Sequence, residues 1–301
     1  MSWKEFAVTV PASTANLGPG FDSIGLALDL QMTIKASPSL EWVVEYTDCN
    51  YQHLSSGKDN LIVVTALAVA KQFSRQLPAA KLLIDSDIPL GKGLGSSAAA
   101  IAGGIEIADR LLGLELQIRD KVKIGSQMEG HPDNISASFY GGLTISYVDG
   151  QEVESIRVQE VEIGVVIMMP PNEFLTTESR GLLPASLLHH VATQGSAASN
   201  VLTAALVQGD WETAGRMMGK DTFHEPFRKS RFSDFDSIRQ VSKGLGAYGS
   251  AISGAGPSLF IAVNAGEEGK IAVQLRKEFP HYQCIVTKPS SAGVKSFEMV
   301  I

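Results

Sequence analysis

Two periodicities of hydrophobic residues alternate along the first half of the chain. Period-two alternation with branched residues, bounded by Pro, Ser or Gly, predicts strands at Phe6–Pro11, Met32–Ala36, Trp42–Tyr46, Lys81–Asp85, Leu143–Val148 and Ser155–Val158. Helical spacing predicts helices between them, at Asn60–Gln76, Ser96–Leu112, Ile118–Met128 and Asn134–Tyr140. Strands and helices are interleaved, so this half is expected to form a mixed α/β unit.

The pattern changes after the apolar run Ile163–Pro171, which predicts a fully buried strand that ends at a proline. The remainder predicts helices at Ser186–Gln208, Trp211–Met218, Phe235–Leu245 and Glu267–Phe279, and strands at Gly249–Ser253, Leu259–Val263 and Gln283–Thr287. Helices on paired strands indicate an α+β sandwich, although the order of the strands cannot be read from one sequence. We therefore predict an α+β protein with two domains, residues 1–160 and 161–301.

Composition narrows the class of protein. A chain of 301 residues with 44% hydrophobic residues can bury a large core, and its net charge of −7 without a basic run argues against nucleic-acid binding. The most apolar tract, Leu61–Ala70, is far shorter than the ~20 residues of a membrane span. Lys4 and Glu5 lie where a signal peptide would need an apolar stretch. Cys49 and Cys284 lie far apart in the sequence, which argues against a disulfide scaffold. We expect a soluble cytoplasmic protein.

A glycine-rich segment, IPLGKGLGSSAAA from Ile88 to Ala100, joins a predicted strand to a predicted helix. Glycines at alternate positions let backbone N–H groups approach an anion, and the helix N-terminus adds unpaired donors. Ser96 or Ser97 could ligate a magnesium ion that accompanies a nucleotide. The spacing fits neither G-x-G-x-x-G nor G-x-x-x-x-G-K-[ST]. Taken alone, the segment could also be a glycine turn capped by serine.

The complete string resembles a known family motif. Pro89–Ala98 matches P-x-x-x-G-L-G-S-S-A, the second motif of the GHMP kinases, while PASTANLGPGFD (Pro11–Asp22) resembles their first motif and SGAGPS (Ser253–Ser258) their third. With three motifs in order, the chain is identified as a member of this superfamily. The resemblance implies a two-domain GHMP kinase fold, in which an N-terminal mixed α/β domain with a left-handed-crossover phosphate loop precedes a C-terminal ferredoxin-like α/β sandwich.

The same resemblance implies that ATP binds with Mg²⁺. The residues implied to bind ATP are Asn60, Pro89, Leu90, Gly91, Lys92, Gly93, Leu94, Gly95, Ser96, Ser97, Ala98, Gly254 and Gly256. The side chain of Lys92 could contact phosphate or could simply be exposed to solvent. The position of the adenine pocket is open, with Asn60 and Leu61 as candidates.

The first motif is similar to that of homoserine kinases in particular, with Ser13 and Thr14 in exchanged order. This resemblance implies that Asn16 and Asp22 face the amino acid. A carboxylate suits an ammonium group and an amide suits either end of a zwitterion. Both side chains could instead satisfy turns around Gly18–Gly20.

Three further segments resemble homoserine kinases. EGHPDN (Glu129–Asn134) implies Glu129 as a magnesium ligand with Ser97, and Asp133 beside the reacting hydroxyl. Other family members space this pair further apart, and Asp133 could also be only the N-cap of the helix from Asn134. NEFLTTESRGLLP (Asn172–Pro184) implies Thr176 and Arg180 as substrate contacts, and FHEPFR (Phe223–Arg228) implies Arg228.

Two arginines suit a substrate carboxylate, which mevalonate also carries. His224 could be a base or a structural histidine. The expected reaction is ATP-dependent phosphorylation of the side-chain hydroxyl of L-homoserine in threonine biosynthesis, by a homodimer. Asp133, Glu129 and Ser97 are the expected catalytic residues, although the hydroxyl proton could go to Asp133 or to the γ-phosphate itself.

Two other functions remain open from the sequence. Another GHMP activity, such as that of mevalonate kinase, would use the same phosphate loop with a different substrate pocket. A non-catalytic ligand sensor would be expected to lose Ser97, Glu129 or Asp133, and all three are present.

Overall fold

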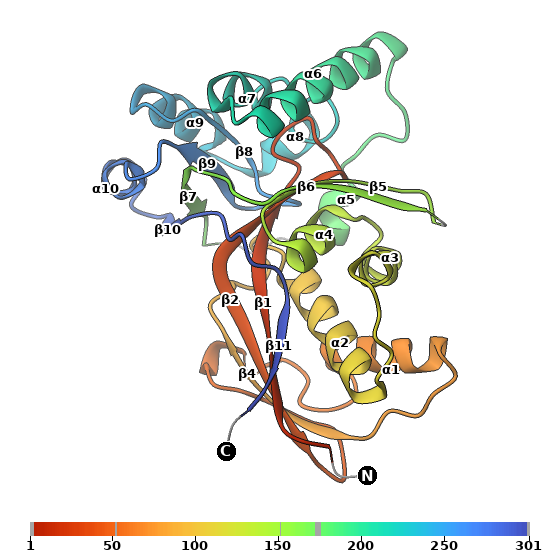
Figure 1. The fold of residues 1–301 in the computed structure, drawn as a ribbon. Helices are drawn as coiled ribbons and strands as arrows, with labels where there is room; N and C mark the ends of the chain where they lie inside the picture. Colours follow the sequence, from red (N-terminus) through yellow and green to blue (C-terminus); the bar gives the residue numbers. More distant parts are fainter. Residues whose placement is uncertain (1–2, 52, 151, 172–175, 300–301) are drawn as a thin grey trace.

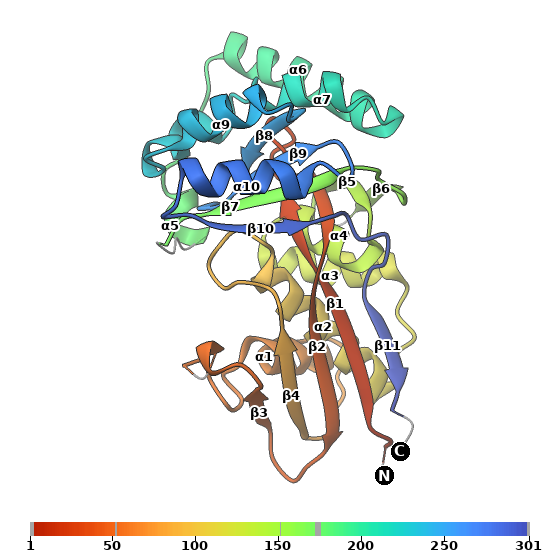
Figure 2. The same cartoon turned by 90° about the vertical axis from the view of Figure 1, so that its left-hand side faces the viewer.

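A computed structural model describes residues 3–51, 53–150, 152–171 and 176–299. In the described part of the chain, two β-sheets are stacked end to end with helices around them (Figure 1). Figure 2 shows the same molecule turned by 90°, with the second sheet and its helices above the first. The combination of sheets and helices confirms the predicted α+β class.

The first sheet has the order β11-β1-β2-β4-β3, and β5 and β6 extend it from β2. Its strands are β1 (Phe6–Ala15), β2 (Ile24–Pro38), β3 (Val43–Tyr46), β4 (Ala80–Ser86), β5 (Leu143–Val148), β6 (Val153–Val158) and β11 (Lys295–Glu298). All pairs are antiparallel except β3–β4, which α1 connects. One face is covered by α1 (Leu61–Gln72), α2 (Ser96–Leu112), α3 (Ile118–Glu129) and α4 (Asp133–Tyr140), as Figure 1 shows.

The second sheet has the order β10-β7-β9-β8. Its strands are β7 (Gly164–Met169), β8 (Gly249–Ile252), β9 (Leu259–Val263) and β10 (Gln283–Thr287). In chain order this is fourth, first, third, second, with helices after the first and third strands, which confirms the predicted ferredoxin-like sandwich. The helices are α5 (Thr176–Arg180), α6 (His189–Gln208), α7 (Trp211–Met218), α8 (Glu225–Arg228), α9 (Phe235–Gly244) and α10 (Glu268–Glu278); short 3₁₀ turns occur at Cys49–Tyr51 and Lys229–Arg231.

Strand β7 is buried on both faces, as its apolar run predicts. Val165 and Ile167 belong to a hydrophobic core shared with the first sheet. Val166 and Met168 point the other way, into a smaller core with residues of α9 and α10. The strand therefore joins the two halves through side chains rather than through a linker.

Two parts of the first sheet differ from the expectation. Strand β2 begins at Ile24 rather than Met32, because its first five residues are all buried and show no period-two alternation. Strand β11 was not predicted, since four mostly exposed residues carry no hydrophobic signal. It pairs with β1, so the end of the chain returns to the first sheet. The division at residues 160 and 161 stays a prediction.

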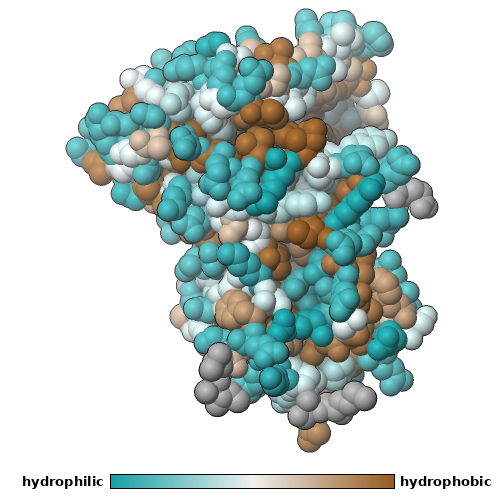
Figure 3. Space-filling model, in the orientation of Figure 1, coloured by the Kyte–Doolittle hydropathy of each residue, from teal (hydrophilic) through white to brown (hydrophobic). Residues whose placement is uncertain are grey.

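The surface drawn in Figure 3 is mostly hydrophilic, with separate hydrophobic patches. Among the described residues, no helix combines the length and the apolar character that a membrane span requires.

Candidate active site

The three motifs meet at one pocket between the two sheets. Each comes from a different part of the chain: the β1–β2 turn, the loop before α2, and the loop between β8 and β9. The lining residues are Asn16, Phe21, Asp22, Gly91, Gly93, Gly95, Ser96, Ser97, Glu129, His131, Asp133, Asn134, Arg180, Arg228, Gly254, Ala255 and Gly256. Most residues expected at the site are therefore neighbours in space.

The loop before α2 has the backbone of an anion site. Gly91, Gly93 and Gly95 all have φ between 62° and 71°, the left-handed region in which residues with a side chain are strained. Among the described residues, no side chain caps the N-terminus of α2, so the first N–H groups of this long helix are available for a ligand. Together with the positive end of the helix dipole, these donors favour a phosphate.

The first and third motifs hold this loop in place by close contact. A Cβ on Gly93 would lie 2.2 Å from the carbonyl oxygen of Ser253, and one on Gly95 would lie 2.2 Å from the Oγ of Ser13. The hydroxyl of Ser253 donates to the carbonyl of Gly93 at 2.6 Å. Glycine is required here by both conformation and space.

Ser97 and Glu129 form the pair expected to hold a divalent cation. The Ser97 hydroxyl donates to Oε2 of Glu129 at 2.9 Å, across the gap between α2 and α3. Burial raises the pKa of Glu129, although His131 and the hydrogen bond from Ser97 partly oppose this shift. A hydroxyl and a carboxylate at this separation are hard oxygen donors of the kind that Mg²⁺ prefers.

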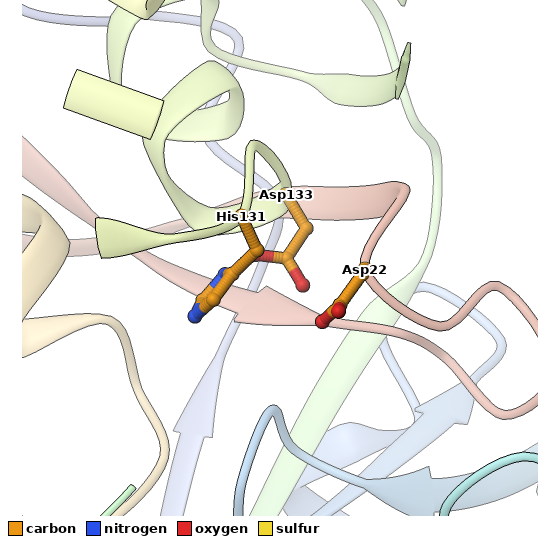
Figure 4. Close-up of side chains that lie close together, drawn as sticks. All are labelled: Asp22, His131 and Asp133. Atoms are coloured by element: carbon orange, nitrogen blue, oxygen red, sulfur yellow. The ribbon is translucent and has the colours of Figure 1, made fainter. Parts of the chain in front are cut away.

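Asp133 lies at the start of α4 beside His131 and Asp22 (Figure 4). Its Oδ1 accepts from Nδ1 of His131 at 2.5 Å and from the backbone N–H of Asn134 at 2.6 Å. The N-cap position is occupied by Pro132, so the alternative role of Asp133 as an N-cap is wrong. Burial lowers the pKa of His131, but the adjacent carboxylate outweighs it and the net shift is upward.

The side chains of Asp22, His131 and Asp133 place their possible ligand atoms within 4.8 Å of one another, which is close enough for a metal ion. Asp22, however, already makes two charge-assisted bonds with Arg180, from Nη2 to Oδ1 at 2.7 Å and from Nη1 to Oδ2 at 3.1 Å. Of this group, the sequence reasoning missed His131. Its position between Glu129 and Asp133 was the available signal.

Asn16 lies in a tight turn with Leu17 and Asp22, and all three have positive φ. The Asn16 side chain accepts from the backbone N–H of Asp22 at 3.0 Å and donates to the carbonyl of Gly254 at 3.0 Å. The Asn16 amide thus provides hydrogen bonds within the turn, which was the alternative role expected for it, and it also lines the pocket. Its two proposed roles are compatible.

Arg228 is only 2% exposed, yet it lines the pocket. Burial lowers its pKa to about 10, so the guanidinium stays charged at neutral pH. Its Nη1 contacts Nδ1 of His224 at 3.2 Å and donates to the carbonyl of Gly254 at 3.1 Å, while Nε has no hydrogen-bond partner among the described residues. A buried, incompletely paired guanidinium is a ready partner for a carboxylate.

His224 is fully buried and contacts the guanidinium of Arg228. Because arginine can only donate, Nδ1 must accept, and Nε2–H then donates to the carbonyl of Gly18 at 3.0 Å. Burial lowers the pKa of His224, which fits a neutral ring. The ring also stacks on Phe21, at 5.3 Å between centroids. These contacts favour the structural role over the role of a base.

A second pocket, of about 350 Å³, adjoins the first and shares Ser96 and Ser97 with it. Its walls are mainly apolar and include Leu61, Ile88 and the stacked rings of Tyr46 and Tyr51. Asn60 caps α1 through the N–H of Ile62 and donates to the hydroxyl of Tyr46 at 2.8 Å. An apolar pocket that also has polar lining groups, beside a glycine-rich loop, has the properties that a nucleobase requires.

Several residues expected to bind ATP lie outside both pocket linings. Lys92 donates through Nζ to the carbonyls of Pro170 and Pro171, at 3.0 and 2.9 Å. Leu94 and Ala98 are fully buried in the core, and Pro89 is in neither lining, whereas Leu90 lines the apolar pocket. Thr176 is the first residue of α5, and its side chain lies outside the described part of the structure, as do residues 172–175 of the same segment.

Comparison with known proteins places this geometry in a family. Models of the GHMP kinases N terminal domain and the GHMP kinases C terminal match residues 60–142 and 202–281. The homoserine kinase of Halalkalibacterium halodurans is 43% identical over 291 residues, covering 96% of this chain and 94% of the relative. The homoserine kinase of Bacillus cereus strain B4264 is 45% identical over 275 residues, covering 91% of each.

Solved structures agree with the sequence relatives. The homoserine kinase from Cytophaga hutchinsonii superposes with a TM-score of 0.85 at 25% identity, covering 99% of this chain and 98% of that one. The mevalonate kinase of Methanococcus jannaschii, at 18% identity and a TM-score of 0.71 over 94% of this chain and 98% of its own, shares the fold. On its motifs, its fold and these relatives, the chain belongs to the homoserine kinase family of the GHMP kinases.

Proposed function

We propose that this protein transfers the γ-phosphoryl group of ATP to the side-chain hydroxyl of L-homoserine and so forms O-phospho-L-homoserine for threonine biosynthesis. One observation carries the proposal. An uncapped helix N-terminus, three carboxyl groups and two arginines line a single pocket, and an apolar pocket adjoins it. Phosphoryl transfer mainly requires positioning and charge neutralisation, and this set of groups supplies both.

The nucleotide would lie across the two pockets. The base would fit the apolar pocket, whose lining includes Tyr46 and Asn60, and the phosphates would fit the glycine loop at the start of α2. Ser97 and Glu129 would hold Mg²⁺, which neutralises charge on the transferring phosphate. Burial raises the pKa of Glu129, and a nearby cation would lower it by favouring the carboxylate.

The amino acid would lie on the opposite wall of the polar pocket. Arg228 lines the pocket and would present its guanidinium to the substrate carboxylate, and Arg180 would turn from Asp22 to join it. Asp22 would then be available for the substrate ammonium group. The zwitterionic substrate would thus replace the ion pair between Arg180 and Asp22.

The substrate hydroxyl would face Asp133, whose Oδ1 is held by His131 and by the backbone of Asn134. These bonds leave Oδ2 for the hydroxyl, which would be oriented toward the phosphate loop. Asp133 either accepts the proton or positions the hydroxyl while the phosphate accepts it. In both cases the residue acts at the reacting atoms.

The wider setting is also a proposal. We expect no nucleic-acid partner, because the net charge is −7, and a cytoplasmic location, because Cys49 and Cys284 are both free thiols. The homodimer is expected from the family resemblance alone. We also expect residues 1–160 and 161–301 to act as the nucleotide domain and its partner domain.

The test is release of ADP by the purified protein with ATP and Mg²⁺, with L-homoserine, mevalonate, galactose and L-serine offered separately. Turnover with homoserine alone supports the proposal. Turnover with mevalonate or galactose would favour another GHMP activity. ATP binding without turnover on any alcohol would favour a sensor, and the presence of Ser97, Glu129 and Asp133 argues against that result.

A further inference from the structure

A buried carboxyl group lies behind the substrate arginine, outside the pocket lining. Glu225 is the first residue of α8, is 4% exposed, and stands three residues before Arg228. Buried carboxylates are costly unless paired and hydrogen-bonded, so the surroundings of Glu225 need an explanation. The proposed mechanism does not use it.

Its contacts connect three segments of the fold. Oε2 accepts from Nη2 of Arg239, on α9, at 2.8 Å, and Oε1 accepts from the backbone N–H of Ile252, at the end of β8, at 2.7 Å. Its own N–H donates to Oδ2 of Asp221 at 2.6 Å. Arg239 is itself fixed, because it donates to Ser250 and its guanidinium lies 4.4 Å from the ring centroid of Phe235.

These contacts bear directly on the position of Arg228. The guanidinium of Arg228 donates to the carbonyl of Gly254, which lies two residues after Ile252. Glu225 therefore connects both partners of that hydrogen bond. It belongs to the same short helix as Arg228, and its carboxylate binds Ile252, which leads into the loop that contains Gly254. Loss of its charge would loosen one relative to the other.

We propose that Glu225 is a positioning residue for the amino-acid substrate, which fixes Arg228 against the Gly254 turn through its ion pair with Arg239. The inference rests on the proposed function, since Arg228 is taken to bind the substrate carboxylate. Glu225 touches neither substrate and is not a catalytic residue.

The charge of this group changes in the range where the enzyme would work. Burial raises the pKa of Glu225 to about 7, against the lowering effect of Arg239. The charged groups that face it are Arg239 from α9 and Asp221 before α8, while β8 presents the N–H of Ile252. Homoserine affinity is therefore expected to fall as the pH drops below 7 and the ion pair is lost.

The decisive variant is Glu225→Gln, which keeps the shape and an acceptor for Ile252 but removes the charge. We expect its KM for homoserine to rise about tenfold at pH 8, in line with the loss of one charge-assisted bond, while kcat and the KM for ATP change less than about twofold. At pH 6 the ratio of variant to wild-type KM should approach one, because the wild-type carboxyl group is then protonated. The ratio cancels the titration of other groups at the site.

Two further variants make the test independent of folding. Glu106→Gln breaks another largely buried ion pair, with Lys121 at 2.6 Å, away from the pocket, and should leave the KM for homoserine unchanged. Arg239→Gln should raise that KM to a similar extent, and the double variant should add little.

A KM for Glu225→Gln within twofold of the wild type at pH 8, or a ratio that stays constant from pH 6 to 8, overturns the inference. In that case wild-type turnover with homoserine still supports the proposed function. Absence of wild-type turnover with homoserine overturns both.

Discussion

The ionisable side chains of the site take their properties from burial and from close neighbours. Glu129 is partly buried and Glu225 is buried, and burial raises the pKa of both carboxyl groups, but Glu129 has a serine hydroxyl beside it and Glu225 an arginine. His131 is buried too, and its pKa is raised because it faces Asp133. At this scale each residue can be tested by changing one charge.

Replacement of Asp133 tests the reacting hydroxyl. Asp133→Ala is expected to lower kcat by about 10²- to 10⁴-fold, the range for loss of a group that acts on a transferring proton. ATP affinity should stay within about twofold, because Asp133 does not line the apolar pocket. Steady-state kinetics and calorimetric titration with ATP would check both parts. Near-normal turnover would contradict either role for this carboxylate.

Glu225 also predicts a pH dependence of stability. Its pKa rises from 4.5 in the unfolded chain to about 7 in the fold, so the folded state holds the proton more tightly between these values. The resulting stabilisation is complete below pH 4.5 and is lost as the pH rises through 7, a change of about 3 kcal/mol in the free energy of unfolding.

Glu225→Gln lacks this titration, so its stability relative to the wild type should increase between pH 5 and pH 8. Urea unfolding of both proteins at the two pH values measures the difference. Parallel changes in the two proteins would show that Glu225 does not titrate in this range.

At the scale of elements, the loop before α2 shows how local sequence and distant contacts combine. The helix Ser96–Leu112 has the predicted bounds, because a glycine in the left-handed conformation flanks each end, at Gly95 and Gly113. Only Gly95 is also in contact with another element, through Ser13. The two glycines therefore form a matched pair, with the same conformation but different surroundings.

Gly95→Ala is expected to weaken ATP binding at least tenfold, because the new methyl group would collide with Ser13 and displace the phosphate loop. Gly113→Ala meets no atom within 4 Å and should cost only about 1 kcal/mol of stability, with ATP affinity unchanged. Calorimetry with ATP and thermal unfolding would separate the two effects. Equal ATP affinities would exclude the collision as the reason for the glycine.

What the sequence could predict follows from this distinction. The phosphate loop and the pocket residues Asn16, Asp22, Arg180 and Arg228 were accessible, because they lie in contiguous motifs, and the family resemblance of those motifs implied the ferredoxin-like half. The roles of those residues stay predictions. The pairing of β11 was not accessible, since it depends on a contact between segments far apart in the chain.

The whole molecule is held together by one core that crosses both sheets. The larger hydrophobic cluster includes Val8 and Leu28 of the first sheet, Phe260 of the second, and Leu202 of α6. The chain end also pairs with β1 through β11. The larger core thus belongs to both halves, whereas the smaller core lies within the second half alone.

We therefore expect the protein to unfold in one cooperative transition, in spite of its two sheets. Differential scanning calorimetry should give equal calorimetric and van't Hoff enthalpies, provided that unfolding is reversible. Two resolved transitions would show that the halves are independent.

The carbonyl of Gly254 accepts from both Asn16 and Arg228, while the neighbouring Ser253 hydroxyl donates to Gly93 of the phosphate loop. In the proposed binding mode, the two substrates would lie against opposite sides of one short turn. Whichever ligand binds first would order that turn for the second, and thermodynamic linkage would make the benefit equal in both directions. Homoserine should tighten the binding of a non-hydrolysable ATP analogue by the same factor as the analogue tightens the binding of homoserine. Such synergy would let the enzyme commit to ATP only when its alcohol is present.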